Sequence, residues 1–293
     1  MKGKLILPYI MLNLLAGIGS AVMFWFSNLD PIWIGTFFAT FPTPFLLMVL
    51  SQALGIARTS KKLPLLQAMS VGGLALIGYF LIVRGGPSSN AEFASLGFAL
   101  FGALSLQWYI HIFSNYGRKK SSSIARGKML PELSLQRLDG SKVSSRSFVG
   151  QQTLMVFFRA NWCPFCMNQL KEVRSKAQQL ADSGVQVKLI PNQGISNAKK
   201  LAKDLNLPAH FEILQDDELS AAKTLGIEDM GGAPSGMPGY PVDTVMATVI
   251  ALDMNGRVMF GDETDNYRVR PHPDTFIDVF EQPSNVTPLA VAA

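Results

Sequence analysis

The hydrophobic residues of the chain follow two patterns, which change near residue 117. Before that point, four apolar runs contain no Asp, Glu, Lys or Arg: Leu5–Ser27, Pro31–Ala57, Leu63–Val83 and Phe93–Tyr116. A helix that crosses a bilayer needs about 20 such residues. The pattern predicts an all-α transmembrane bundle of four helices over residues 1–117, with the second helix kinked or broken at Pro42 and Pro44. Three spans with one re-entrant segment are the alternative.

After residue 130 the pattern alternates between short apolar strands and amphipathic helices. The expected strands are Leu133–Leu138, Lys142–Val143, Thr153–Phe158, Val185–Ile190, Phe211–Leu214, Ala247–Leu252 and Arg257–Phe260. The expected helices are Pro164–Asp182, Ser196–Leu205, Asp217–Leu225 and Asp274–Glu281. Parallel β–α–β units followed by an antiparallel hairpin and a terminal helix predict an α/β sandwich over residues 131–282. Residues 118–130 are expected to be a basic linker, and residues 283–293 a disordered tail.

The charged residues divide at the same place. Residues 1–117 hold eight of them and the remainder of the chain holds 39. Residues 131–293 sum to −4, so the basic excess belongs to the membrane flanks and the linker. A nucleic-acid-binding protein would carry that excess on its folded domain, so this class is excluded.

Lys and Arg in the short connections predict the orientation of the spans. Ten of them lie before the first run, between the second and third runs, and after the fourth, against only Arg84 on the other side. The rule places both termini in the cytoplasm, as expected for a multi-pass protein of a bacterial inner membrane. The spans contain neither Cys nor an acidic residue, so they are expected to anchor the chain or dock a partner.

The two cysteines, Cys163 and Cys166, stand between a predicted buried strand and a predicted helix. Pro164 suits the first helical position, which makes Cys163 the N-cap. The partial positive charge of a helix N-terminus favours a thiolate, so we expect a lowered pKa at Cys163. Cys163 is then the nucleophile, and Cys166, one turn deeper, the resolving thiol. A zinc site with His210 and His272 and an inert buried pair are the alternatives. We expect neither a metal nor a cofactor.

Several stretches resemble a known family. They are Leu130-Pro131, Asp139-Gly140, Phe148-Val149-Gly150, Val156-Phe157-Phe158 and Phe158-Arg159-Ala160-Asn161-Trp162-Cys163-Pro164-Phe165-Cys166, with later likeness at Ile213–Asp216 and Asp265–Pro271. Together they resemble the redoxin branch of the thioredoxin superfamily, which includes the peroxiredoxins (alkyl hydroperoxide reductase and thiol-specific antioxidant proteins). The resemblance covers about residues 130–282 and implies a thioredoxin-like sandwich with a redox-active cysteine pair.

The resemblance also indicates supporting residues and two departures. Ala160 stands where peroxiredoxins carry a hydroxyl side chain, so Arg159, Arg268 or Arg270 is expected to stabilise the thiolate or polarise a peroxide. Trp162 is expected to shape the surface beside the nucleophile. Met246 or Ala247 occupies the place of the cis-proline that faces the disulfide in thioredoxin-like reductases.

Two functions from different classes remain. The first is a membrane-tethered thiol oxidoreductase and antioxidant, in which Cys163 and Cys166 act on a disulfide or a peroxide. An external thiol donor such as thioredoxin or glutathione then reduces the pair. The second is a non-catalytic redox sensor or scaffold, whose disulfide state controls a membrane partner.

Overall fold

The computed structural model describes residues 3–234, 237 and 239–281. Its contacts divide the chain into two compact units, Met1–Asn115 and Tyr116–Ala293. The predicted tail, 283–293, lies outside the described residues.

The first unit is a bundle of helices. Its elements are α1 (Gly3–Phe26), α2 (Ile32–Thr40), α3 (Pro42–Pro44), the π-helix η1 (Phe45–Leu50), α4 (Ser51–Ala53), α5 (Pro64–Val83), α6 (Asn90–Trp108) and the π-helix η2 (Tyr109–Phe113). Four described segments are long and apolar enough to cross a membrane: Gly3–Phe26, Ile32–Ala53, Pro64–Val83 and Asn90–Phe113. The second keeps helical dihedrals at Phe41 and Phe45, and its hydrogen-bond pattern changes from α to π directly after Pro42 and Pro44, because proline lacks the N–H that an α-helix requires.

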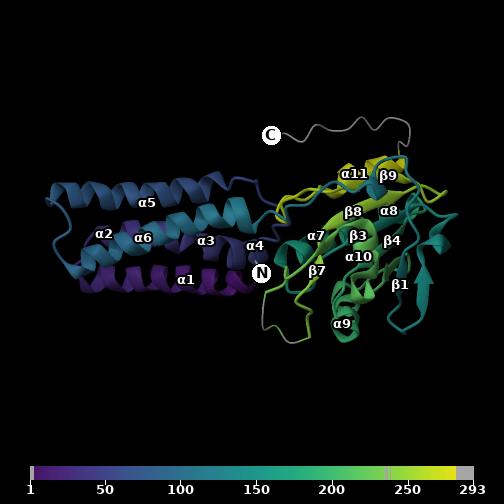
Figure 1. The fold of residues 1–293 in the computed structure, drawn as a ribbon, viewed down its shortest axis with the longest axis horizontal. Helices are drawn as coiled ribbons and strands as arrows, with labels where there is room; N and C mark the ends of the chain where they lie inside the picture. Colours follow the sequence, from purple (N-terminus) through teal and green to yellow (C-terminus); the bar gives the residue numbers. More distant parts are fainter. Residues whose placement is uncertain (1–2, 235–236, 238, 282–293) are drawn as a thin grey trace. The chain divides into compact units, whose positions relative to one another are not determined.

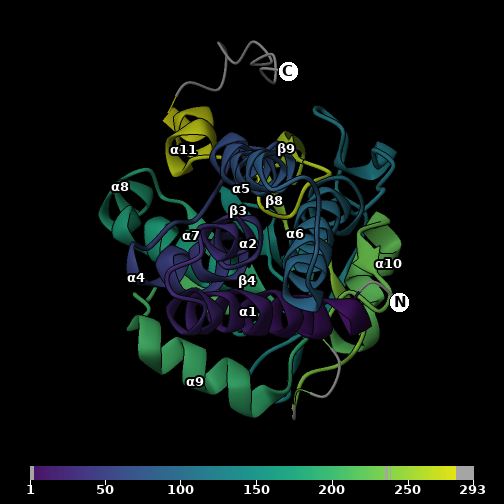
Figure 2. The same ribbon diagram turned by 90° about the vertical axis from the view of Figure 1, so that its left-hand side faces the viewer.

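Helix α2 is central to this unit and packs against α1, α5 and α6 (Figures 1 and 2). Gly35 on α2 faces Gly73 on α5, and a Cβ on either residue would collide with the backbone oxygen of the other. The missing side chains therefore let the two helices approach closely, a common means of packing apolar helices.

The second unit is built on one five-stranded sheet in the order β5-β4-β3-β8-β9. Strand β3 (Thr153–Phe157) pairs in parallel with β4 (Gln186–Ile190), which pairs in parallel with β5 (Phe211–Ile213). On its other side, β3 pairs antiparallel with β8 (Thr248–Leu252), and β8 with β9 (Val258–Asp262). This arrangement is the predicted α/β sandwich.

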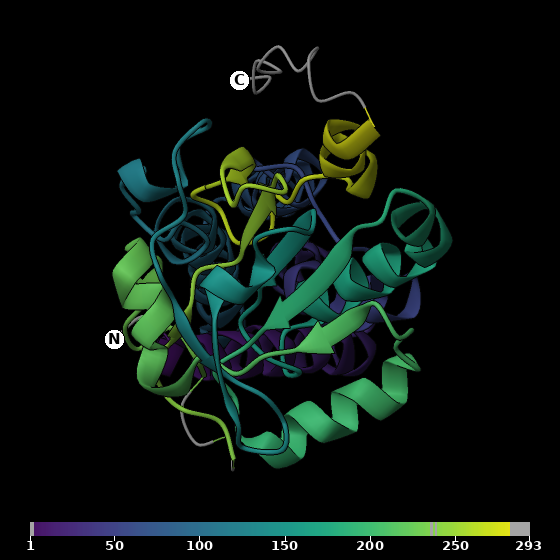
Figure 3. The ribbon, with the colours of Figure 1, turned by 90° about the vertical axis from the view of Figure 1, so that its right-hand side faces the viewer.

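The remaining elements cover this sheet or extend its rim. They are the 3-10 helix η3 (Ser122–Ile124), β1 (Ser134–Gln136), β2 (Lys142–Ser144), the 3-10 helix η4 (Ser145–Phe148), α7 (Pro164–Ser175), α8 (Ala177–Asp182), α9 (Ile195–Leu205), the 3-10 helix η5 (Asp217–Leu219), α10 (Ser220–Leu225), β6 (Glu228–Asp229), β7 (Thr244–Val245) and α11 (Pro273–Glu281). Figure 3 shows α10 on one side of the sheet and α7 with α8 on the other. Every residue of β3 is buried, so the strand that leads to the cysteines lies in the core.

The predicted linker differs from a free tether. Residues 116–130, which we call the docked segment, belong to the second unit and pair with its strand β9. Gly127 N–H donates to the carbonyl of Val258 (2.7 Å), and Leu130 N–H donates to that of Gly256 (3.1 Å). Ile124 is buried in the hydrophobic core. Backbone pairing with the start of β9, which the local sequence does not reveal, accounts for the difference.

A glycine-to-alanine change tests this docking. A Cβ on Gly261 would lie 2.6 Å from Ile124 Cγ2 and 2.7 Å from the Ile124 carbonyl oxygen. We expect Gly261→Ala to lower the free energy of unfolding by about 1–3 kcal/mol, because it overpacks this contact. In Gly194→Ala, the nearest atom to the new Cβ, the Gly239 carbonyl oxygen at 3.6 Å, is in ordinary contact. Gly194 is the N-cap of α9, where alanine is less favourable than glycine, so this control should lower the free energy of unfolding by at most about 1 kcal/mol in denaturant. Equal stability of the two variants would contradict the docking.

Candidate active site

The cysteines lie where the buried strand β3 leads to helix α7. Cys163 is the N-cap of α7, with φ −89° and ψ 108°, and Pro164 occupies the first turn, as predicted. Both cysteines are free thiols. They are also deeply buried: Cys163 is 1% exposed and Cys166 is 0% exposed. An oxidant therefore reaches them only through a local opening of the surface.

Arg270 joins the two sulfurs from the loop between β9 and α11. Its Nη2 lies 3.3 Å from Cys166 Sγ and 3.9 Å from Cys163 Sγ. Its other nitrogens are held in place: Nη1 donates to Gln169 Oε1 (2.8 Å), and Nε donates to the Tyr267 carbonyl (2.9 Å). Arg270, one of the two C-terminal arginines considered from the sequence, therefore contacts both sulfurs.

Arg159 lies in an aromatic enclosure near the pair. Its guanidinium carbon is 4.8 Å from the ring centre of Trp162, 5.0 Å from that of Tyr267 and 6.0 Å from that of Tyr116. It also forms an ion pair with Asp229 (3.5 Å) and donates to the Gly232 carbonyl. Burial opposes the charge on Arg159, but Tyr116, Asp229 and Cys163 outweigh it and raise the pKa of its guanidinium. Two cations, Arg159 and Arg270, thus act on the cysteine pair.

Arg268 is fully buried as well, and its backbone N–H donates to Asn266 Oδ1 (3.1 Å). Its supporting role stays a prediction.

The structure places the negative charge of the cysteine pair on a different sulfur from the one predicted. Burial and the hydrogen bond with Cys166 raise the pKa of the Cys163 thiol well above its usual range. Burial also opposes ionisation of Cys166, but the hydrogen bond with Cys163 and the charge of Arg270 outweigh it and lower the pKa of Cys166 to about 5. The expectation of a lowered pKa at Cys163 is therefore wrong for this arrangement, because the hydrogen bond between the sulfurs stabilises the charge on Cys166 and Arg270 lies closer to Cys166. The two coupled thiols titrate as a pair. When one proton has left the pair, the other lies on Cys163, and its transfer to Cys166 makes Cys163 the thiolate.

A titration checks this distribution of charge. We expect the ultraviolet thiolate absorbance of the reduced protein to rise once, with a midpoint near pH 5, because the pKa of Cys166 is lowered to about 5. One thiolate per chain is then present at pH 7 and is lost as the pH falls through the midpoint. The double variant Cys163→Ser/Cys166→Ser supplies the baseline. A midpoint at about 8.5, as in the free amino acid, would contradict the assignment.

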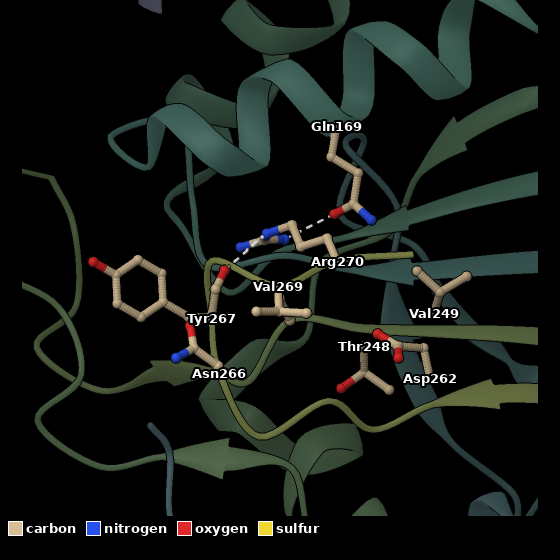
Figure 4. A pocket seen from close by; sticks show the side chains of 9 residues that line it. Gln169, Thr248, Val249, Asp262, Asn266, Tyr267, Val269 and Arg270 are labelled. Atoms are coloured by element: carbon tan, nitrogen blue, oxygen red, sulfur yellow. Dashed lines mark hydrogen bonds between the residues drawn. The ribbon is translucent and has the colours of Figure 1, made fainter. Parts of the chain in front are cut away.

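A small pocket adjoins Arg270. Figure 4 shows Arg270 and Gln169 along one part of its lining, with Thr248 and Asp262 across from them. Burial raises the pKa of the Asp262 carboxyl, against the opposing effects of Thr264, Arg118 and Arg270. The pocket therefore brings together a half-buried carboxyl group and the buried guanidinium that contacts both sulfurs.

The site includes residues that sequence reasoning missed. They are Gln169, Tyr267, Asp229 and Tyr116. Gln169 follows Cys166 by three residues on α7, and this helical spacing is the one signal that could have indicated it. Among the described residues there is no cis peptide bond, so Met246 and Ala247 do not reproduce a cis-proline turn. Ala160 is buried and carries no hydroxyl group.

Comparison with known proteins agrees with this architecture. Residues 126–259 match the AhpC/TSA family. The chain is 25% identical to chloroplastic peroxiredoxin Q of Suaeda salsa, over 53% of this chain and 71% of that protein. It is 27% identical to chloroplastic peroxiredoxin Q of Triticum aestivum, over 41% of this chain and 55% of that protein.

The chain is also similar to a solved structure, peroxidoxin BcpB from Mycobacterium tuberculosis. The identity is 16%, the TM-score is 0.45, and the match covers 55% of this chain and 99% of that one. Over residues 126–259, the chain therefore carries a thiol-dependent oxidoreductase domain of the AhpC/TSA family.

Proposed function

We propose that the protein is a membrane-tethered peroxidase in which Cys163 and Cys166 reduce a small peroxide and become an intramolecular disulfide. The observation that carries the proposal is the buried pair itself, with one guanidinium, that of Arg270, in reach of both sulfurs. The proposal selects peroxide from the two substrates that the sequence leaves open.

The reaction starts from the pair with a single negative charge. The Cys163 thiolate attacks the terminal peroxide oxygen, the O–O bond breaks, and the alkoxide takes the proton from Cys166. Cys163 is now a sulfenic acid and Cys166 a thiolate. Cys166 attacks the Cys163 sulfur, the S–S bond forms, and the hydroxide that leaves takes a proton from solvent. Two electrons have passed from the dithiol to the peroxide, which yields an alcohol and water.

Burial favours a small oxidant over a protein disulfide. Neither cysteine is more than 1% exposed. A bulky protein disulfide therefore requires a larger local opening of the protein surface than a hydroperoxide does. Ala247, in the place considered from the sequence for substrate recognition, also has both backbone polar groups engaged. Its N–H donates to Tyr116 Oη (3.0 Å), and its carbonyl accepts from Arg118 Nη1 (3.4 Å). An extended peptide finds no free backbone there with which to pair.

Arginine replaces the missing hydroxyl group in this mechanism. The side chain of Ala160 offers no donor, whereas Arg270 can donate to a peroxide oxygen that enters beside the sulfurs. Charge-assisted donors are stronger than neutral ones and stabilise the negative charge that develops on the leaving oxygen. An external thiol such as thioredoxin or glutathione then reduces the disulfide, which has to become accessible in the oxidised protein.

Rapid mixing of the reduced full-length protein with hydrogen peroxide tests the peroxidase activity. We expect consumption of one peroxide per chain at a rate constant at least about 100-fold above that of free cysteine at pH 7, since positioned donors commonly contribute that much. The double variant Cys163→Ser/Cys166→Ser is the matched blank. A rate no faster than free cysteine, together with rapid reduction of a protein disulfide, would transfer the assignment to disulfide exchange.

We further propose that the first unit anchors the protein with the AhpC/TSA domain on the cytoplasmic side. The supporting observations are the four apolar helices and the excess of Lys and Arg at one set of their ends. The pair is too buried to label, so single cysteines are introduced into the double serine variant. Lys142→Cys on the domain should react with a membrane-impermeant thiol reagent only after lysis, and Asn90→Cys in intact cells. The reverse pattern would invert the orientation.

A further inference from the structure

The first residues of the docked segment reach the redox site. Tyr116 follows the last residue of η2, Phe113, by three positions, and its N–H donates to the Asp265 carbonyl (2.8 Å). Arg118 N–H donates to Asp265 Oδ1 (2.8 Å). Both bonds lie on the loop that continues to Tyr267 and Arg270. The segment is therefore fixed to the loop that supplies the guanidinium at the sulfurs.

The side chains of Tyr116 and Arg118 hold one edge of the pocket beside Arg270. Tyr116 and Arg118 each form one hydrogen bond with the backbone of Ala247. Arg118 Nη2 also donates to Thr248 Oγ1 (3.0 Å). Ala247 and Thr248 line the same pocket as Arg270. Figure 4 shows Thr248 and Arg270 in this lining. The Arg118 side chain is only 2% exposed, and Glu263 lies 3.9 Å from its Nη2. These hydrogen bonds are thus shielded from solvent. Removal of one partner would leave the other buried and unpaired, which lowers stability.

Tyr116 also contributes to the enclosure of Arg159. Its ring is one of three that surround the guanidinium, with those of Trp162 and Tyr267. Burial raises the pKa of the Tyr116 hydroxyl to about 12, so the phenol is neutral at physiological pH and accepts the Ala247 N–H without adding a charge. A neutral ring beside a buried guanidinium stabilises the cation where it acts on the cysteines.

We propose that Tyr116 and Arg118 are positioning residues of the redox site. They set the reactivity of Cys163 and Cys166 by holding Arg159 and the Ala247–Thr248 edge of the pocket opposite Arg270. This inference rests on the proposed peroxidase function and deepens it. It makes the residues that directly follow the last membrane-spanning segment part of the active site, although they touch neither sulfur in the contacts described above.

The test uses the full-length protein in detergent and compares two variants with one matched control. Tyr116→Leu removes the ring and the acceptor for Ala247. Arg118→Gln removes the charge but keeps a hydrogen-bond donor, and it provides the readout if Tyr116→Leu does not fold. Lys119→Gln removes the same charge from the neighbouring exposed residue. Each protein is titrated by thiolate absorbance and mixed rapidly with hydrogen peroxide across the same pH range.

We expect both variants to raise the apparent pKa of the cysteine pair by about 1, which below that pKa means about a tenfold loss of thiolate and of peroxide reactivity. Lys119→Gln should match the wild type. A merely structural role would lower the unfolding temperature and leave the pKa unchanged, and that result overturns the inference. If the wild type itself has no thiolate at pH 7 and no peroxide reaction, the proposed function fails independently of the variants.

Discussion

Replacement of Cys163 by serine is expected to abolish peroxide turnover, a loss of at least about 1000-fold, because a hydroxyl group at this place is a far weaker nucleophile than a thiolate. Cys166 remains in the variant beside Arg270, whose charge favours the Cys166 thiolate. Turnover is measured as peroxide consumption in the presence of a thioredoxin system or glutathione. The loss of activity then reports on which sulfur attacks, and not on the presence of a thiolate alone.

The matched control is Cys166→Ser, which keeps the proposed nucleophile and removes the resolving thiol. One equivalent of peroxide should convert Cys163 into a sulfenic acid that a dimedone-type reagent captures, because no second thiol in the chain can displace it. Capture of a sulfenic acid on Cys166 in the Cys163→Ser protein, with retained activity, would reverse the proposed order of attack.

Arg270→Gln is expected to have the second-largest effect. Burial opposes a thiolate at this site, and the Arg270 charge is among the contributions that lower the pKa of Cys166 to about 5. Without the guanidinium, the pKa of the pair should rise by about 2 or more, as is typical for a buried group that loses a close opposite charge. Peroxide reactivity should fall by about tenfold at pH 6 and by about 100-fold at pH 4, since each pH unit below the pKa costs a factor of ten in thiolate.

An exposed arginine of the same domain serves as the control for Arg270. The side chain of Arg146 is 77% exposed and pairs with Glu132 at the surface. Arg146→Gln therefore removes the same charge from a solvent-exposed position. It should leave both the titration and the peroxide rate unchanged, because surface pairs contribute little. Equal behaviour of Arg270→Gln and Arg146→Gln would show that the contact between Arg270 and the sulfurs is not functional.

Most of the fold follows from local patterns. Strand β3 is buried along its whole length and stands out as a continuous apolar run. The apolar segments of the first unit reach the length of about 20 residues that a membrane helix needs. The prediction missed β6 and β7, because two residues per strand are too few to show a period. It also joined α7 and α8, since the change of backbone at Lys176 (φ −94°, ψ 12°) leaves the apolar spacing intact.

The candidate site was predictable only where its parts are adjacent in the chain. The place of Cys163 and Pro164 at the start of α7 follows from the order of apolar run, cysteine and proline. Tertiary folding, in contrast, brings Arg270 to the sulfurs from more than 100 positions away in the chain. It also buries the two sulfurs in contact with one another and places Arg270 nearer to Cys166 (3.3 Å) than to Cys163 (3.9 Å). The hydrogen bond between the sulfurs and the charge of Arg270 together reverse the expected pKa order.

The central claim is that Cys163 and Cys166 are one redox pair that a peroxide oxidises within the chain. Intact-mass analysis of the reduced full-length protein after one equivalent of hydrogen peroxide tests it most directly. The account predicts a mass loss of two hydrogen atoms, no remaining free thiol, and one peptide that links Cys163 to Cys166. A gain of oxygen with both cysteines unlinked, or a disulfide between two chains, would contradict it.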